Sequence, residues 1–122
     1  MKRGETVILA GASGLIGGAL ARELAAAGIK VRRLVRRPPQ AADEVSWSPE
    51  TGQLDPAVVS GAAAVVNLSG ANIAAGRWTQ ARKAAIRDSR LQATRTLVAA
   101  IRAASTPPPV FVSASAVGIY AA

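Results

Sequence analysis

The stretch TVILAGASGLIGGALARELAAAG, residues 6–28, decides the fold. Thr6–Ala10 is a short apolar run that ends at a glycine, which is typical of a buried strand in a parallel sheet. The run Gly11–Gly18 is rich in glycine, and Leu15–Ala27 has the spacing of a helix that Gly28 ends. A strand, a glycine-rich turn and a helix in this order indicate the first unit of a parallel α/β sheet.

The glycine-rich turn has the pattern G-x-x-G-x-x-G. In such a turn the first glycine permits the sharp bend, the second lets the backbone approach a pyrophosphate, and the third lets the helix pack on the strand. Free amides at the start of the helix, together with the positive end of its dipole, favour phosphate. The turn therefore predicts a dinucleotide site, and an alternative is that the glycines serve only the turn and the packing. The expected contact residues are Gly11, Ser13, Gly14, Leu15, Ile16 and Gly17.

The rest of the chain continues the alternation of strands and helices. The predicted elements are strands at 31–35, 45–47, 62–68 and 110–114, a turn of helix at 56–60 and a long helix at 79–104. Proline-rich breaks follow the second strand and the long helix, as expected for segments that cannot continue either structure. Strands and helices that alternate at this spacing predict a doubly wound α/β fold with a parallel sheet.

Two arginines follow the second predicted strand. An acidic residue about 20 positions after the glycines would bind the ribose 2′-hydroxyl and favour NAD. The sequence offers Leu34-Val35-Arg36-Arg37 instead, and a guanidinium can pair with a 2′-phosphate. We therefore expect NADP(H) to be preferred over NAD(H), with Arg36 or Arg37 binding the phosphate. The basic residues before them, Lys30, Arg32 and Arg33, are expected to gather in the same region, and the alternative is that the two arginines are solvated loop residues.

Length and composition exclude several classes of protein. A chain of 122 residues supports one domain, so residues 1–122 are expected to form a single NADP(H)-binding domain. The absence of cysteine and histidine excludes disulfides and the commonest metal ligands, and no metal is expected. No apolar run approaches the roughly 20 residues that cross a bilayer, and the first residues do not form a secretory signal. A cytoplasmic protein without a membrane partner is expected.

The chain is basic, with 15 Lys and Arg against 7 Asp and Glu and a net charge of +8. Such a balance can indicate a nucleic-acid partner, and Lys83, Arg87 and Arg90 share one face of the predicted long helix. Solvated helix faces are the commoner reason for such a pattern. The scarcity of aromatic residues also argues against a platform for stacking bases. No nucleic-acid partner is therefore expected.

Beyond the glycine turn, further blocks of sequence match a known family. They are Trp47 with Pro49, Asn67–Gly70, Ala75–Trp78, Asp88–Arg90 with Thr94, and Ser113–Gly118. With these blocks the chain resembles the N-terminal part of the short-chain dehydrogenase/reductase superfamily, in its extended or atypical branch. It is most similar to the predicted nucleoside-diphosphate-sugar epimerase family, and the resemblance runs over nearly the whole chain.

The resemblance implies a Rossmann-type sheet with strand order 3-2-1-4-5, truncated after strand five. It also implies that the segment after the fourth strand lines the ribose side of the cofactor, and an ordinary strand-ending turn is the alternative. The residues concerned are Asn67, Leu68, Ser69 and Gly70. Ser115, at the end of the fifth strand, would be catalytic by orienting a substrate hydroxyl or carbonyl, unless it is a small packing residue.

The chain departs from the family at its catalytic pair. The superfamily uses a Tyr-x-x-x-Lys pair some tens of residues after that serine, but Tyr120 is the only tyrosine here and no lysine follows it. Family members run to about twice this length or more, adding two strands and a substrate-binding portion. Whether the chain is an enzyme by itself is thus undecided.

We expect the NADP(H)-binding domain of an epimerase- or reductase-like protein, acting on a sugar nucleotide or a similar hydroxyl or carbonyl substrate. Without the missing parts it is expected not to be catalytic alone. The alternative is a non-catalytic NADP(H)-binding regulatory module. The uncovered edge of strand five is expected to permit self-association.

Overall fold

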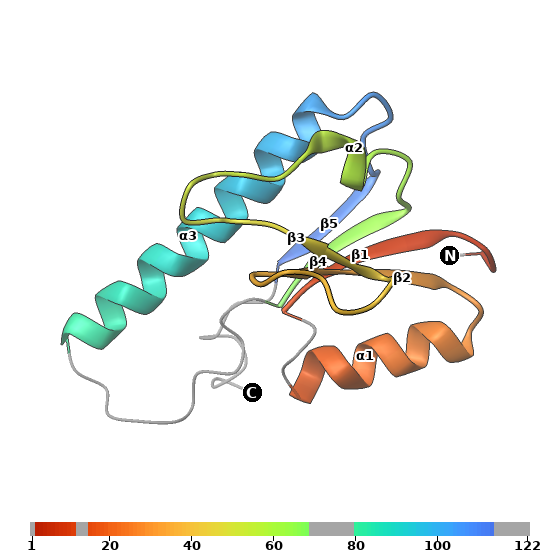
Figure 1. Cartoon of the computed structure of the whole chain (residues 1–122), viewed down its shortest axis with the longest axis horizontal. Helices are drawn as coiled ribbons and strands as arrows, with labels where there is room; N and C mark the ends of the chain where they lie inside the picture. Colours follow the sequence, from red (N-terminus) through yellow and green to blue (C-terminus); the bar gives the residue numbers. More distant parts are fainter. Residues whose placement is uncertain (1, 12–14, 69–79, 114–122) are drawn as a thin grey trace.

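The computed structural model describes residues 2–11, 15–68 and 80–113. Its elements are β1 (Thr6–Ala10), α1 (Leu15–Ala26), β2 (Lys30–Val35), β3 (Glu44–Ser46), α2 (Pro56–Val59), β4 (Ala64–Asn67), α3 (Gln80–Ala103) and β5 (Val110–Ser113). Within these ranges the strands form one parallel sheet in the order β3-β2-β1-β4-β5 (Figure 1). The predicted Rossmann-type sheet with order 3-2-1-4-5 is therefore confirmed.

The sheet is covered on both faces, with α1 on one face and α2 and α3 on the other (Figure 1). Because side chains alternate along a strand, β1 contributes to both layers. Val7 and Leu9 pack in clusters that include α1 residues, whereas Ile8 packs with Leu97 of α3. These side chains are fully buried, and each such burial contributes about 1.5–3 kcal/mol to folding. Burial on both faces explains why β1 is an unbroken apolar run.

Local signals set the ends of the elements close to where the sequence predicts them. Gly28 has a φ of 80°, which a glycine adopts without strain, and its N–H donates to the carbonyl oxygen of Ala25 at the end of α1. The short α2 begins with Asp55, whose side chain accepts a hydrogen bond from the N–H of Ala57, and has Pro56 in its first turn. The fourth strand is shorter than predicted, because the N–H of Ala62 still closes the turn after α2.

Both outer strands of the sheet are short. On the β5 side, Val110 and Val112 are 48% and 50% exposed, and among the described residues no strand pairs with the outer side of β5. On the β3 side, the strand is flanked by the charged pairs described below. The described helices include none that is long and apolar enough to cross a membrane.

Candidate functional site

The strands of the parallel sheet end together at one edge. In the strand register Ala10 lies between Leu34 and Asn67, and Asn67 lies beside Ser113. We call this row, where β1, β2, β4 and β5 end, the carboxyl edge. The N–H of Leu68 donates to the carbonyl oxygen of Ala10 at 2.8 Å, so the chain stays close to β1 as it leaves β4. A doubly wound sheet binds its ligands beyond this edge.

The glycine turn lies at the centre of the carboxyl edge. Gly11, directly after β1, has a φ of 83°, a conformation that side-chain-bearing residues rarely adopt. The helix α1 starts at Leu15, includes Ile16 and the buried Gly17, and has no acidic residue in its first turn. Its positive amino end is therefore not neutralised by a carboxylate of its own, which suits a pyrophosphate. Ser13 and Gly14 lie outside the described residues.

Asn67 is the last residue of β4 and Leu68 follows it, and both are buried. The Asn67 amide donates from Nδ2 to Oγ of Ser113 at 3.3 Å, which joins the ends of β4 and β5. The sequence predicts no role for Ser113, although its place at the end of β5 is the signal for one. The other predicted residues in this part of the site, Ser69, Gly70 and Ser115, lie outside the described residues.

Arg37 makes a two-point contact with a buried acid. Its Nη1 and Nη2 donate to Oε1 and Oε2 of Glu44 at 2.9 and 2.8 Å, and the backbone N–H of Gln40 donates to Oε1 at 2.8 Å. The Glu44 side chain is only 5% exposed. The hydrogen bonds from Arg37 and then from Gln40 lower the pKa of Glu44 from its ordinary 4.5 to about 2, because they stabilise the charged form.

A second pair adjoins this one. Arg33 donates from Nε and Nη2 to the two carboxylate oxygens of Asp43 at 2.8 and 3.0 Å, and its Nη2 lies 3.6 Å from Glu44. The hydrogen bond from Arg33 lowers the pKa of Asp43, and the same bond raises the pKa of Arg33. We call Arg33, Arg37, Asp43 and Glu44 the β3 ion cluster. Its members are matched in charge, two cations with two anions.

Arg36 pairs differently from its neighbour. Its Nη1 donates to Oε1 of Glu50 at 3.0 Å, a contact of a single donor with a single oxygen. The two arginine side chains are similarly exposed, 41% for Arg36 and 45% for Arg37. The carboxylate side chains that they bind differ in exposure, 54% for Glu50 and 5% for Glu44. An ion pair between two exposed side chains contributes little to stability.

The expectation that five cations gather at the phosphate site is wrong. Lys30 lies at the amino end of β2, and Arg32 donates to the carbonyl oxygen of Val58 beside α2 at 2.8 Å. Arg33 lies within β2 and shares Glu44 with Arg37 in the β3 ion cluster, and Arg36 and Arg37 follow the carboxyl end of the strand. Successive residues of a strand point to opposite faces, which separates neighbours such as Arg32 and Arg33.

The structure also brings together residues that the sequence analysis missed. Glu44 and Glu50 lie 7 and 14 residues beyond the arginines that they bind. The parallel register of β2 and β3 places Glu44 directly beside Arg33. An acidic pair just before the third predicted strand, Asp43-Glu44, was the available signal for partners of the arginines.

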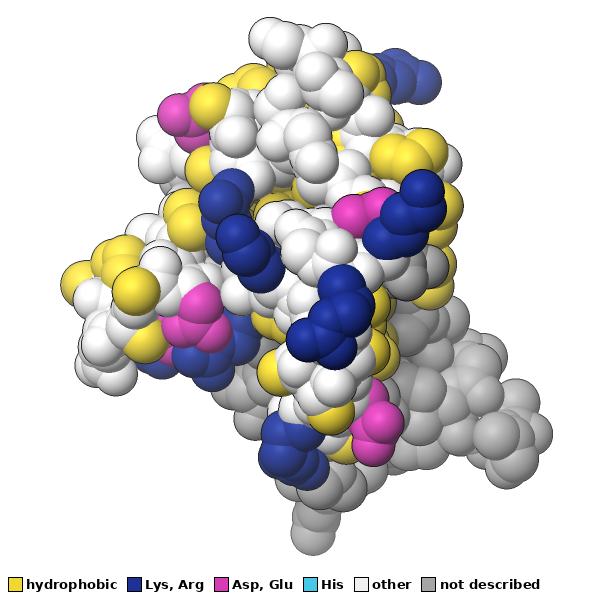
Figure 2. Space-filling view, turned by 90° about the vertical axis from the view of Figure 1, so that its right-hand side faces the viewer, with side chains coloured by type: hydrophobic (Ala, Val, Ile, Leu, Met, Phe, Trp, Pro, Cys, Tyr) yellow, Lys and Arg dark blue, Asp and Glu magenta, His cyan; other side chains and the backbone are white. Residues whose placement is uncertain are grey.

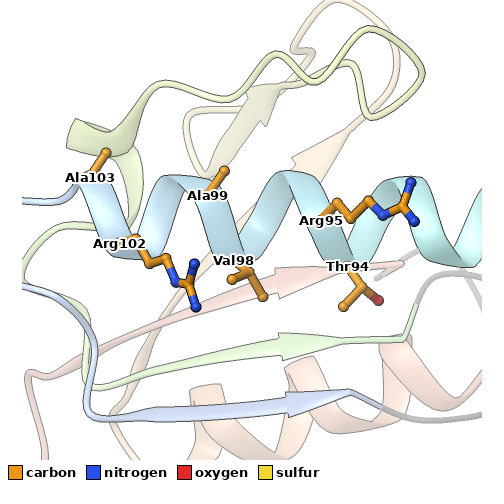
Figure 3. Close-up of a pocket in the computed structure, with 6 residues that line it drawn as sticks. All are labelled: Thr94, Arg95, Val98, Ala99, Arg102 and Ala103. Atoms are coloured by element: carbon orange, nitrogen blue, oxygen red, sulfur yellow. The ribbon is translucent and has the colours of Figure 1, made fainter.

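A groove of 640 Å³ lies elsewhere, along the second half of α3 (Figure 3). Its lining residues are Thr94, Arg95, Val98, Ala99, Arg102 and Ala103. Ala103 ends α3 before the loop that leads into the start of β5, so the groove extends toward the amino ends of the strands. None of its lining residues lies at the carboxyl edge, and we do not assign the cofactor to it.

The surface at the amino ends of the strands is mixed in charge (Figure 2). Lysine and arginine side chains are scattered over this face, between acidic and apolar ones, and they form no continuous basic stripe there. A nucleic-acid backbone is bound by cations that line one path. This face does not have that pattern.

Comparison with known proteins gives a consistent picture. The model of the NAD dependent epimerase/dehydratase family matches residues 7–122. The epimerase family protein Mb2239 of Mycobacterium bovis is 47% identical over 114 residues, which cover 93% of this chain and 37% of that relative. The epimerase family protein ML0860 of Mycobacterium leprae is 44% identical over 118 residues, 97% of this chain and 38% of the relative. The chain thus spans little more than a third of the length of these curated relatives.

Solved structures agree with the fold. The human epimerase family protein SDR39U1 (isoform 2), crystallised with NADPH, matches 88% of this chain and 35% of its own with a TM-score of 0.73 and 32% identity. The nucleoside-diphosphate sugar epimerase of Corynebacterium glutamicum matches 95% of this chain and 23% of its own, also with a TM-score of 0.73, at 34% identity.

Proposed function

The chain belongs to the NAD dependent epimerase/dehydratase family, and from this premise we propose that it binds NADP(H), in preference to NAD(H), at the carboxyl edge of its sheet. One observation carries the preference for the phosphorylated cofactor. Arg36 and Arg37 follow β2 where an NAD-binding protein has an acid. The human relative that was crystallised with NADPH supports the same choice.

Each part of the site has a separate task in this proposal. The turn at Gly11 and the amino end of α1 hold the pyrophosphate, and the residues after β2 hold the 2′-phosphate. The segment that begins with Asn67 lies along the ribose, and Ser115 orients the substrate. The bound nicotinamide would supply or accept the hydride. All of these tasks are binding and orientation, and none requires a general base.

We propose a sugar nucleotide, or a similar hydroxyl or carbonyl compound, as the substrate of the full-length protein. The resemblance to the Corynebacterium glutamicum epimerase supports this class. The 122 residues have no Tyr-x-x-x-Lys, so we expect them to bind the cofactor without turning substrate over. Loss of a positioned proton-transfer group lowers a rate by about 10²- to 10⁴-fold.

The second candidate is a regulatory module that binds NADP(H) and catalyses nothing, even at full length. The observation that favours it is the described part of the site, in which the turn at Gly11, the start of α1 and Arg36 are all suited to binding the cofactor. Assaying a full-length relative for hydride exchange between NADPH and NADP⁺ in the presence of sugar nucleotides separates the two candidates. Exchange supports the enzyme, and its absence with normal cofactor binding supports the module.

We also propose that the β5 edge permits self-association. The supporting observations are the exposed Val110 and Val112 and an outer side of β5 with which no strand of the described residues pairs, since such edges pair readily with other strands. Sedimentation analysis over a range of concentrations tests this. Val112→Lys should reduce association, whereas a monomer at all concentrations would contradict the proposal.

Calorimetric titration of the 122-residue chain with NADPH, and separately with NADH, tests the cofactor proposal. We expect saturable binding that is tighter for NADPH. Gly11→Val is the matched loss-of-site variant, because a β-branched residue at a φ of 83° is strained and should abolish binding of both nucleotides. A folded wild-type chain that binds neither nucleotide would overturn the proposal.

A further inference from the structure

We propose that Glu50 competes with the cofactor's 2′-phosphate for Arg36. Glu50 holds Arg36 beyond the end of β2 and releases it when a 2′-phosphorylated nucleotide binds. Arg37, in contrast, remains with Glu44 as part of the fold. The inference rests on the proposed function and deepens it, because it chooses between two adjacent arginines and adds a specificity-determining acid to the site.

The geometry of the Arg37–Glu44 pair keeps Arg37 bound to Glu44. Both of its Nη atoms donate to Glu44, whose carboxylate also accepts from the backbone N–H of Gln40 and lies near Arg33. Moving Arg37 to a phosphate would leave a side chain of 5% exposure without its main cation. Breaking a pair around a buried carboxylate is strongly unfavourable. Arg37 therefore positions the strand end, and it is not available to the cofactor.

Glu50 is held in place by an anchored turn. The turn follows the buried Trp47, and Ser48 and Gln53 exchange two backbone hydrogen bonds of 2.9 and 2.8 Å across it. The hydroxyl of Thr51 donates to Oγ of Ser48 at 2.9 Å. Oγ1 of Thr96 in α3 donates to the Gln92 carbonyl oxygen at 2.7 Å and also lies 3.4 Å from the Pro49 carbonyl oxygen. Glu50 is thus presented to Arg36 by a fixed piece of backbone.

The Arg36–Glu50 pair is nevertheless easy to exchange. Both side chains are about half exposed and share a single hydrogen bond of 3.0 Å. A phosphate monoester carries about −1.5 to −2 charges at pH 7 and offers three acceptor oxygens, so it can bind a guanidinium with two parallel hydrogen bonds. It therefore displaces a singly bonded carboxylate. A nucleotide with a 2′-hydroxyl has no such charge and leaves the pair closed.

Competition between Glu50 and the 2′-phosphate predicts different effects on NADPH affinity and on NADH affinity. Removing Glu50 should favour only ligands that use Arg36, because the pair no longer has to open. An exposed pair contributes little, so we expect Glu50→Gln to tighten NADPH binding about two- to fivefold and to leave NADH binding unchanged. The matched control is Glu23→Gln, the same substitution at an exposed carboxylate on α1.

The test is a double-mutant cycle, with the affinities of NADPH and NADH measured by calorimetry on the 122-residue chain. The variants are Glu50→Gln, Arg36→Gln, their combination and Glu23→Gln, with thermal unfolding recorded for each. The inference is supported if Glu50→Gln tightens NADPH binding and Glu23→Gln does not. The tightening must also be absent when Arg36 is already replaced.

Two results would overturn the inference while leaving the proposed function intact. One is an equal gain in Glu23→Gln, which would assign the effect to net charge alone. The other is a gain that persists in the Arg36→Gln background, which would show that Glu50 does not act through Arg36. Failure of the folded wild-type chain to bind either nucleotide is a different outcome, and it refutes the proposed function together with this inference.

Discussion

The β3 ion cluster and the Arg36–Glu50 pair lie near the same end of β2, and they differ in how exposed the carboxylate is. In the β3 ion cluster, a buried carboxylate is bound by two donors of one arginine and by a backbone amide. At the neighbouring Arg36, an exposed carboxylate on a turn meets one donor. The arginines themselves are similarly exposed. The comparison teaches that the surroundings of the partner, and not those of the cation, decide whether an arginine holds the fold or stays available to a ligand.

The largest expected effect is the loss of NADPH affinity when Arg36, and not Arg37, is replaced. Arg36→Gln removes charge-assisted hydrogen bonds to the 2′-phosphate, so NADPH affinity should fall about 10- to 100-fold while NADH affinity is unchanged. Parallel calorimetric titrations measure both. A similar loss for both nucleotides would mean that Arg36 does not distinguish the phosphate.

The second effect concerns stability and belongs to the β3 ion cluster. Glu44→Gln removes the carboxylate partner of Arg37, whereas Arg33 keeps Asp43, so the midpoint of thermal unfolding should fall by several degrees. Glu50→Gln serves as the matched control and should shift stability by less than about 0.5 kcal/mol. Equal shifts in the two variants would remove the distinction between the regions.

A third effect is the dependence of stability on pH. The pKa of Glu44 is about 2 in the folded chain and near its ordinary 4.5 when unfolded, so its contribution is complete above pH 4.5. The contribution is lost as the pH falls from 4.5 to about 2, because the unfolded chain takes up the proton first. Denaturant unfolding of wild type and Glu44→Gln at several pH values measures this. Their difference should shrink over that window, and a constant difference would contradict the assigned cause.

Much of the fold followed from local patterns in the sequence. The first strand, the glycine turn and the helix after it carry their own signals, namely an apolar run, a glycine that takes a positive φ and the glycine that ends the helix. The parallel sheet was confirmed in its predicted order. The signals for strands and helices depend on the periodicity of neighbouring residues, which a single sequence displays directly, whereas the strand order was implied by the resemblance to a known family.

The partners of the arginines could not be predicted in the same way. That Arg33 lies beside Glu44 depends on the register between β2 and β3, which no local pattern specifies. Glu50 reaches Arg36 only because the turn after β3 is closed by Ser48 and Gln53. Sequence therefore indicated the cations of the candidate site and left their anions unassigned.

The central claim is that Arg36 recognises the 2′-phosphate and that Arg37 maintains the fold. The most direct test is the ratio of NADPH to NADH affinity in two variants, Arg36→Gln and the double replacement Arg37→Gln/Glu44→Gln, which removes both members of the committed pair. We predict that the ratio collapses to about one in the first variant and keeps its wild-type value in the second. Retention of the ratio in Arg36→Gln, with its loss in the double variant, would contradict the account.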